Sequence, residues 1–247
     1  MRAMIMAAGL GTRLRPLTDA TPKPLVPVAG RPMIAWVLDV FERAGFRDVL
    51  VNVHYLAEQL ERFAGEETRR RSGRLRITIQ DEKKEILGSG GAIALAAPWL
   101  FSGHRTAVVC NADSFMQPEV GALLATHEHL RGRSGVVCTL AVMEHQEAGR
   151  KYTGLRVADG LVREFVKADP GRAETLAHFP GLYAVDRDAV AYLAPAGTEC
   201  NIVERMWRPA AAEGRLGAWN YTGLYQDLGT VADLAEAESM LQRMKGG

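Results

Sequence analysis

The feature that most constrains the fold of this chain is a regular alternation of short apolar runs and amphipathic segments over residues 1–134. The apolar runs predict strands at residues 3–8, 48–53, 75–80 and 106–111. Helical spacing predicts helices at residues 33–44, 55–63, 90–97 and 118–130. Strands that alternate with helices form parallel sheets through right-handed β-α-β units. We therefore expect an α/β fold with a Rossmann-like mixed, mostly parallel sheet flanked by helices.

The pattern changes after residue 134, where strands predominate. A long apolar strand is predicted at residues 135–143, and a hairpin at 153–157 and 161–166 around the turn 158–160 (Ala-Asp-Gly). A strand at 178–185 and a short helix at 186–193 follow. The segment 201–212 is expected to be helical with a break near Pro209, and residues 231–244 form an amphipathic helix. We interpret this half as insertions and a small lid on the first sheet, within a single domain of residues 1–247.

Composition excludes several classes of protein. Hydrophobic residues make up 47% of the 247 residues and charged residues 24%, which excludes a disordered chain. The formal net charge of +1 provides no overall field for nucleic acid or anionic lipid, so any anion site must be local. No apolar run reaches the ~18 residues that span a bilayer. Cys110, Cys138 and Cys200 lack C-x-x-C spacing, and Cys110 and Cys138 lie in apolar runs that are typical of reduced core cysteines in a cytoplasmic protein. The basic segment 68–74 is expected to be a solvated loop.

The loop after the first strand carries the strongest chemical signal. It reads Gly-Leu-Gly-Thr-Arg-Leu-Arg-Pro at residues 9–16, followed by Pro-Lys-Pro at 22–24. Gly9 and Gly11 allow a phosphate to approach the backbone N–H groups closely. Arg13 offers a planar fork of donors, and Lys23 a compact ammonium group between two rigid prolines. Because this loop opens at the carboxyl edge of the sheet, where ligands bind in open α/β folds, we favour an anion site over an ordinary surface loop.

Two common phosphate loops do not match this segment. The dinucleotide fingerprint requires a third glycine where this chain has Leu14, which disfavours an NAD-dependent oxidoreductase. A P-loop requires Gly-Lys-Ser/Thr, which the segment lacks.

The segments 9–16 and 22–24 together resemble the signature of the sugar-1-phosphate nucleotidyltransferases. The resemblance implies the nucleotide-diphospho-sugar transferase fold. It also implies a reaction in which a nucleoside triphosphate and a sugar 1-phosphate give a nucleotide sugar and pyrophosphate. The run 1–34 most resembles short bacterial members that uridylylate N-acetylmuramate 1-phosphate, and also mannose- and heptose-1-phosphate guanylyltransferases. By this resemblance, residues 1–134 form a nucleotide-binding half, and residues 135–247 a sugar-binding half with the C-terminal helix.

The resemblance also assigns roles within the first loop. Arg13 is expected to bind the triphosphate, and Lys23 is expected to neutralise the negative charge of the reacting phosphates. The backbone that holds the base and phosphates comprises Ala8, Gly9, Gly11 and Thr12.

Two aspartates are candidates for a Mg²⁺ site. Asp113 follows the predicted strand 106–111, and Asp227 precedes the last helix. Taken alone, each is more typical of a turn or a helix cap. The family places metal aspartates in Asn-Gly/Ala-Asp and Asp-x-Gly-Thr motifs, and both motifs occur here, at 111–113 and 227–230. Mg²⁺ prefers a few carboxylates and retains water and phosphate as its other ligands.

The base and sugar sites are less clearly marked. Gly88, Ser89 and Gly90 open a predicted helix and resemble the stretch that holds base and ribose, with Ser89 as a possible cap. Many relatives read a pyrimidine with an upstream Gln, but this chain has Lys83 and Lys84 there, with Gln80 nearby, so the base stays open. The expected sugar-binding residues are Gly154, Lys167, Gly181 and Asn201.

Some residues near these motifs depart from the family's pattern or are expected to be structural. The segment 165–170 departs from the family's Phe-x-Glu-Lys-Pro, because its Glu is missing and its Lys comes one place early. Trp207 is expected in the core. Asn52 and His54 end the second strand near the same edge, where a lone histidine is usually structural.

The expected mechanism is an in-line displacement without a general base, because a phosphate nucleophile is already ionised at neutral pH. With N-acetylmuramate 1-phosphate as substrate, the enzyme would serve cell-wall recycling. The alternatives are a guanylyl- or cytidylyltransferase for mannose, a heptose or phosphocholine, and a non-catalytic nucleotide-sugar sensor. The expected partners are a nucleoside triphosphate and a sugar 1-phosphate, without nucleic acid or membrane. Monomer and dimer both stay open.

Overall fold

The computed structural model describes residues 1–167 and 174–246, and the side chains of residues 1–167 and 174–243. Residues 168–170 of the segment that follows Lys167 therefore lie outside the described residues. The chain divides into two compact units. The first unit comprises residues 1–86, 109–118 and 223–246, and the second comprises residues 87–108 and 119–222.

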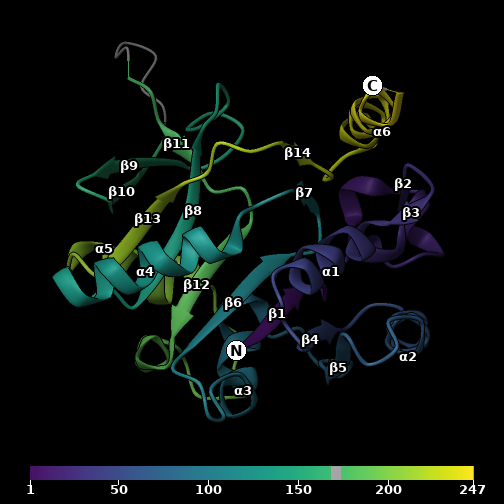
Figure 1. Ribbon diagram of the computed structural model, residues 1–247, viewed down its shortest axis with the longest axis horizontal. Coiled ribbons are helices and arrows are strands. Elements are labelled where there is room, and N and C mark those ends of the chain that lie inside the picture. Colours follow the sequence, from purple (N-terminus) through teal and green to yellow (C-terminus); the bar gives the residue numbers. More distant parts are fainter. Residues whose placement is uncertain (168–173, 247) are drawn as a thin grey trace. The chain divides into compact units, whose positions relative to one another are not determined.

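The first unit is built on three parallel strands, β1 (Arg2–Met6), β4 (Asp48–Val53) and β5 (Arg76–Asp81). Their register pairs Ile5 with Val51, and Val51 with Ile79. The helices α1 (Met33–Arg43) and α2 (Ala57–Arg70) follow β1 and β4, and α2 packs beside β5 (Figure 1). The β-branched residues of β4 and β5 suit a pleated sheet that is covered by helices.

The rest of the first unit consists of short elements around the loop 9–24. These are η1 (Thr12–Leu14), η2 (Leu17–Asp19), η3 (Lys23–Leu25), β2 (Pro27–Val28), β3 (Arg31–Pro32), β7 (Ser114–Met116), β14 (Tyr225–Asp227) and α6 (Val231–Gly246). The strand β14 pairs antiparallel with β7, and the two lie side by side in Figure 1. Leu14, Phe115 and Leu228 are each no more than 2% exposed and belong to one hydrophobic cluster. This cluster joins the loop to both strands.

The second unit centres on β8 (Cys138–Glu144), which pairs parallel with β13 (Leu216–Asn220) and antiparallel with β12 (Leu182–Asp186). The hairpin β9 (Gly154–Ala158) and β10 (Leu161–Val166) and the short β11 (Ala177–His178) complete its strands. The strand β6 (Thr106–Asn111) runs from this unit into the first. The helical elements of the second unit are α3 (Gly88–Leu100), α4 (Val120–Ser134), η4 (Arg187–Tyr192), the π-helix η5 (Val203–Trp207) and α5 (Arg208–Ala212).

The α/β class with a mixed sheet and flanking helices is confirmed, and so is the hairpin turn at residues 158–160. Asp159 and Gly160 both have positive φ angles, of 55° and 74°, as a tight two-residue turn requires. The structure corrects two details. The predicted strand 178–185 is divided between β11 and β12. The predicted break near Pro209 is replaced by a π-helical turn directly upstream, so the helical path continues into α5.

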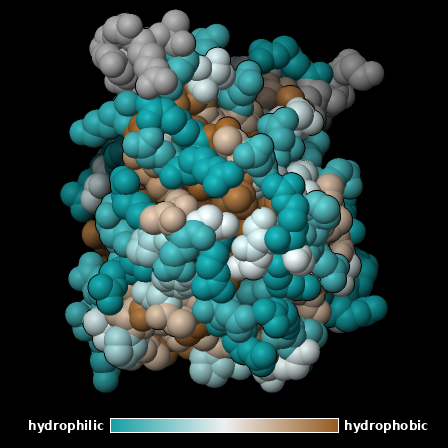
Figure 2. Space-filling model, turned by 90° about the vertical axis from the view of Figure 1, so that its left-hand side faces the viewer, coloured by the Kyte–Doolittle hydropathy of each residue, from teal (hydrophilic) through white to brown (hydrophobic). Residues whose placement is uncertain are grey.

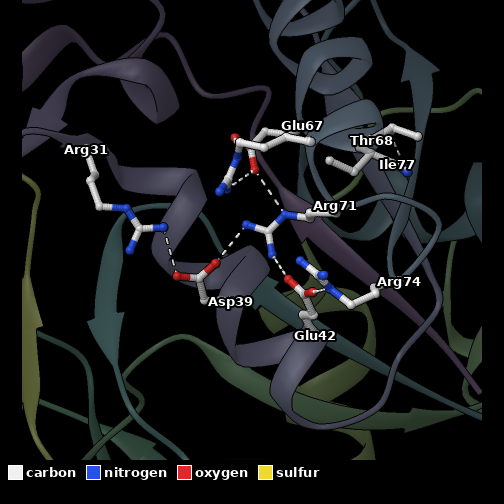
Figure 3. Close-up of polar contacts among 9 residues, drawn as sticks. Arg31, Asp39, Glu42, Glu67, Thr68, Arg71, Arg74 and Ile77 are labelled. Atoms are coloured by element: carbon white, nitrogen blue, oxygen red, sulfur yellow. Dashed lines mark hydrogen bonds and ion pairs between the residues drawn. The ribbon is translucent and has the colours of Figure 1, made fainter.

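A buried ion network corrects the expectation of a solvated loop at residues 68–74. The helix α2 continues to Arg70, and Arg71 caps it with a side chain only 1% exposed. The Arg71 guanidinium lies 2.7 Å from Asp39 Oδ1 and 2.9 Å from Glu67 Oε2, and it also pairs with Glu42 (Figure 3). Further ion pairs extend the network through Arg31, Arg70 and Arg74. The network therefore ties α1 to α2.

Polar side chains cover most of the face drawn in Figure 2, and brown hydrophobic residues gather there only in small groups. Among the described helices, none is both long enough and apolar enough to cross a bilayer.

Candidate active site

Lys23 and Asp113 form the centre of the candidate site. Lys23 Nζ donates to Asp113 Oδ2 at 2.6 Å, and Lys23 as a residue is only 8% exposed. Lys23 begins the short helix η3, and Asp113 lies in the turn between β6 and β7. A flexible lysine is held here against a carboxylate that is still 33% exposed in its side chain. The charge of this ammonium is therefore fixed at a place that ligands can reach.

Gly11 makes the packing of the loop against Lys23 possible. Its φ angle is 66°, and an added Cβ would lie 2.9 Å from both Lys23 Cβ and Thr18 Cγ2. The hydroxyl of Thr18, which is 1% exposed as a residue, donates to the Gly11 carbonyl at 2.8 Å. A residue with a side chain at position 11 would meet both a left-handed backbone and a steric clash. Gly11 therefore sets how closely the loop approaches Lys23.

Replacing Gly11 by alanine is expected to raise the KM for the nucleoside triphosphate about 10-fold or more, because the loop must shift to relieve a clash and a backbone strain of about 1–2 kcal/mol. Steady-state kinetics of pyrophosphate release would measure this change. Gly45→Ala is the matched control, since Gly45 also has a positive φ, of 80°, but an added Cβ meets nothing within 4 Å. An unchanged KM in Gly11→Ala would contradict the positioning of the loop by Gly11.

Arg13 and Asp227 lie together at the second motif. A Cβ built on Gly229 would lie 3.0 Å from Arg13 Nη1 and 3.1 Å from Asp227 Oδ1. Arg13 is exposed and Asp227 is half-buried. The glycine of the Asp-x-Gly-Thr motif thus leaves room for a guanidinium beside a carboxylate.

Backbone pairing brings the two aspartates close together. Asp227 pairs with Ser114, the neighbour of Asp113, in the β7–β14 ladder. The amide of Leu228 also donates to the Asp113 carbonyl at 3.0 Å. The buried side chains of Phe115 and Leu228 pack in the same cluster, which anchors both strand ends. The structure therefore brings together all four predicted residues of the reaction centre: Arg13, Lys23, Asp113 and Asp227.

The two aspartates fit a divalent metal ion. They are oxygen donors at neighbouring ends of the β7–β14 pair, and Asp113 already holds a cation, the Lys23 ammonium group. Among the described residues, no group of three or more His, Cys, Asp and Glu side chains is arranged to hold a metal. A pair of carboxylates suits Mg²⁺, which takes its other ligands from water and phosphate.

The glycines at residues 88–91 have a packing role in the second unit. Gly90 N donates to the Cys200 carbonyl at 2.9 Å, and an added Cβ on Gly88 would lie 2.8 Å from the same oxygen. Ser89 does not cap α3, contrary to prediction, because its hydroxyl accepts the Ile202 amide at 3.1 Å. The side chain of Asn201 accepts the Val203 amide at 2.8 Å and so caps the following helical turn. Their ligand-binding roles stay predictions.

The other predicted sugar residues occupy the strand region of the second unit. Gly154 begins β9, and an added Cβ would lie 2.6 Å from Leu176 Cδ1. Gly181 is buried with a φ of 114° just before β12, and Lys167 is exposed just after β10. Nearby His178 packs against Tyr152, with ring centroids 4.2 Å apart and the ring planes tilted by 37°. Burial, with the charges of His145 and Lys151, lowers the pKa of His178 to about 4, so its ring is neutral at pH 7.

Lys83, which lies in the region where the sequence predicted base recognition, pairs with a residue of α2. Its ammonium lies 2.7 Å from Glu61 Oε1. Gln80, in contrast, is buried and donates to Glu82 Oε1 at 2.9 Å. Glu82 was not predicted from the sequence, and its only signal was its place just after the third apolar run.

A comparison with protein families identifies the chain. The family described as nucleotidyl transferase matches residues 2–243. The chain belongs to this family. Its members generally use a divalent metal, which agrees with the pair of aspartates.

Curated relatives match over almost the whole chain. It is 31% identical over 243 residues to an N-acetylmuramate alpha-1-phosphate uridylyltransferase of Neisseria meningitidis, covering 97% of this chain and 98% of the relative. A protein with the same name from Caulobacter vibrioides is 34% identical, with 95% and 97% covered. A mannose-1-phosphate guanylyltransferase catalytic subunit beta of Danio rerio is 31% identical, with 94% and 62% covered. The predicted enzyme class, sugar-1-phosphate nucleotidyltransferase, is confirmed.

A solved structure confirms the fold. An apo UDP-glucose pyrophosphorylase superposes with a TM-score of 0.77 at 20% identity, covering 99% of this chain and 98% of that chain. At this identity the similarity establishes the nucleotide-diphospho-sugar transferase fold alone.

Proposed function

We propose that this nucleotidyltransferase transfers a uridylyl group from UTP to N-acetylmuramate 1-phosphate, with Mg²⁺ as its metal. The observation that carries the catalytic assignment is the ion pair of Lys23 with Asp113, beside Asp227 and Arg13. The choice of substrates is supported by the relatives at 31% and 34% identity, which match almost from end to end.

In the proposed reaction, a phosphate oxygen of the sugar 1-phosphate attacks the α-phosphorus of the triphosphate. The bond from that phosphorus to the bridging oxygen of the β-phosphate breaks, and pyrophosphate leaves in line. The attacking phosphate is ionised at pH 7, so no side chain has to remove a proton. Catalysis then depends on positioning and on neutralising charge.

Each residue of the proposed centre has a separate task. Asp113 and Asp227 would hold Mg²⁺, which neutralises phosphate oxygens when bound. Lys23 places its ammonium group at the α-phosphate, and Arg13 binds the departing pyrophosphate with its planar donors. In the free enzyme, the Asp113 carboxylate is neutralised by Lys23.

The remaining assignments extend this proposal along the chain. We assign the triphosphate backbone contacts to Ala8, Gly9, Gly11 and Thr12. The base and ribose contacts are assigned to residues 88–90. The sugar contacts are assigned to Gly154, Lys167, Gly181 and Asn201. By this division, residues 1–134 bind the nucleotide and residues 135–247 bind the sugar.

A cytoplasmic location is part of the proposal, and the cysteines support it. Cys110, Cys138 and Cys200 are free thiols and all are buried. Burial raises the pKa of Cys110 and Cys138, so their thiols stay protonated. Reduced, unreactive cysteines of this kind are typical of a reducing compartment.

The test is a matrix of the four nucleoside triphosphates against N-acetylmuramate, mannose, glucose and heptose 1-phosphates and phosphocholine, with pyrophosphate release as the readout. UTP with N-acetylmuramate 1-phosphate is expected to give the highest kcat/KM, with Mg²⁺ required and EDTA inhibiting. A preference for GTP with mannose 1-phosphate would favour the second candidate, which the similarity to the guanylyltransferase of Danio rerio supports. Binding of nucleotide sugars without turnover would indicate a sensor instead.

A further inference from the structure

Where β1 ends, a side chain of β4, and not its main chain, accepts the next backbone hydrogen bond. The parallel pairing of β1 with β4 runs from Ala3–Val49 to Ile5–Val51. Two residues later, the amide of Ala7 donates to the side-chain Oδ1 of Asn52 at 2.7 Å. Ala7 is the last residue before the proposed triphosphate-binding segment 8–12. The hydrogen bond to Asn52 therefore fixes the place where the chain leaves the sheet.

Asn52 is itself held in one orientation by a buried carboxylate. Its Nδ2 donates to Glu82 Oε1 at 3.0 Å, and Gln80 Nε2 donates to the same oxygen at 2.9 Å. Asn52 and Glu82 are 2% and 3% exposed as residues. Because a carboxylate only accepts hydrogen bonds, the Asn52 amide must turn its NH₂ group to Glu82 and its oxygen to Ala7.

Glu82 is anchored in turn by its main chain. Its amide donates to the Val53 carbonyl at 2.9 Å, and its carbonyl lies 2.7 Å from His54 Nδ1. The carboxylate that orients Asn52 is thus fixed to the end of β4 at two points. Buried polar networks in which each member is bonded are rigid, since breaking one bond leaves an unpaired buried group.

We infer that Asn52 is a positioning residue for nucleotide binding, and that Glu82 acts through it. The inference rests on the proposed function of the loop. A main-chain bond at Ala7 would continue the strand ladder, whereas a side-chain acceptor lets the chain turn away from β4. The loop is then held at both ends, at Ala7 by Asn52 and at Gly11 by the Thr18 hydroxyl. Asn52 therefore presets the backbone that receives the triphosphate.

A set of three variants separates positioning from simple stability. Asn52→Asp places a second carboxylate against Glu82, so the side chain turns away, and the KM for the triphosphate is expected to rise about 10-fold. Glu82→Gln keeps an amide oxygen that can accept from both donors but removes the charge that fixes the Asn52 amide, so it is expected to raise this KM by less than Asn52→Asp does. The double variant restores the pair with exchanged roles, because the NH₂ group of Gln at 82 donates to Asp at 52. Gln80 then turns its amide so that its oxygen accepts from the same NH₂ group, and the double variant is expected to recover most of the loss.

Two further readouts make the test specific. The KM for the sugar phosphate is expected to stay unchanged in all three variants. Hydrogen exchange of the Ala7 amide is expected to speed up in Asn52→Asp and to slow again in the double variant. Asn52→Ser, whose shorter side chain brings no second carboxylate, replaces Asn52→Asp if that variant does not fold, with the same rise in KM expected.

The inference is overturned if Asn52→Asp and Asn52→Ser lower the melting temperature but keep the wild-type KM for the triphosphate. It is also overturned if the double variant shows no recovery. The proposed function fails separately, when the wild-type protein releases no pyrophosphate with any pair of substrates. Saturable release by the wild-type protein is therefore measured first.

Discussion

Replacing Asp113 by alanine is expected to slow pyrophosphate release by at least ~100-fold, the scale for losing one preorganised electrostatic contact. The change removes a proposed metal ligand and leaves Lys23, with a side chain only 10% exposed, without its partner. Single-turnover rates at saturating substrates would measure the loss in the chemical step. Lys23→Ala is expected to cause a loss of similar size.

The control for this prediction is Asp188→Ala. Asp188 is also paired with an arginine, Arg105, but lies in the second unit with a side chain 45% exposed. Its replacement is expected to leave the rate near that of the wild type. Near-normal pyrophosphate release by Asp113→Ala would remove the metal assignment.

Replacing Arg71 by methionine is expected to destabilise the first unit by about 3–5 kcal/mol, because breaking a buried ion pair leaves uncompensated charge. Three carboxylates of α1 and α2 share this guanidinium, as Figure 3 shows. Urea unfolding followed by tryptophan fluorescence, to which Trp36 on α1 contributes together with the other three tryptophans, would measure the effect. Arg74→Met is the control, since the Arg74 side chain is 66% exposed and its ion pair is worth at most about 1 kcal/mol.

The same network predicts how stability depends on pH. Burial opposes ionisation of Asp39 and Glu67, but hydrogen bonds and charges of the arginines outweigh it and lower the pKa of both carboxyls. The hydrogen bond from Arg74, with the Arg71 charge, lowers the pKa of Glu42. At acid pH the unfolded chain therefore binds more protons than the folded chain. The stabilisation is fully present above pH ~4 and is lost as the pH falls below this value, through the lowered pKa values of the folded state.

Arg71→Met should therefore lower stability at neutral pH and also reduce the further loss of stability between neutral and acid pH. Melting temperatures measured between pH 7 and pH 3 would show this. Equal acid slopes in the wild type and the variant would contradict the role of Arg71 in ionising the three carboxyls.

The sequence predicted best those elements whose signal is local. The bounds of β4, β6 and β10 match the predicted residues, because each is an apolar run with clear breakers or polar residues on both sides. The helix α2 was predicted too short, because its C-terminal part is rich in arginine and glutamate, a pattern that is typical of a solvent-exposed loop. The burial of Arg71 depends on carboxylates from another helix, which no local pattern reveals.

In the candidate active site, too, the residues with a local sequence signal were the ones predicted. Arg13, Lys23, Asp113 and Asp227 were predicted from motifs, and the structure brings them together. Asn52 was noticed only as a polar residue at a strand end. Its role depends on contacts with Ala7 and Glu82, which are distant in sequence and are visible only in three dimensions.

The pairing of β7 with β14 has a consequence for synthesis of the protein. Asp113 leaves the ribosome long before Asp227, and the hydrophobic cluster that contains Phe115 also needs Leu228 and residues of α6 that are made later still. A nascent chain that already contains the loop, Lys23 and Asp113 therefore still lacks one of the two carboxylates of the proposed metal site. Incomplete translation products would bind nucleotide poorly and remain inactive, so that activity begins only once β14 has been added.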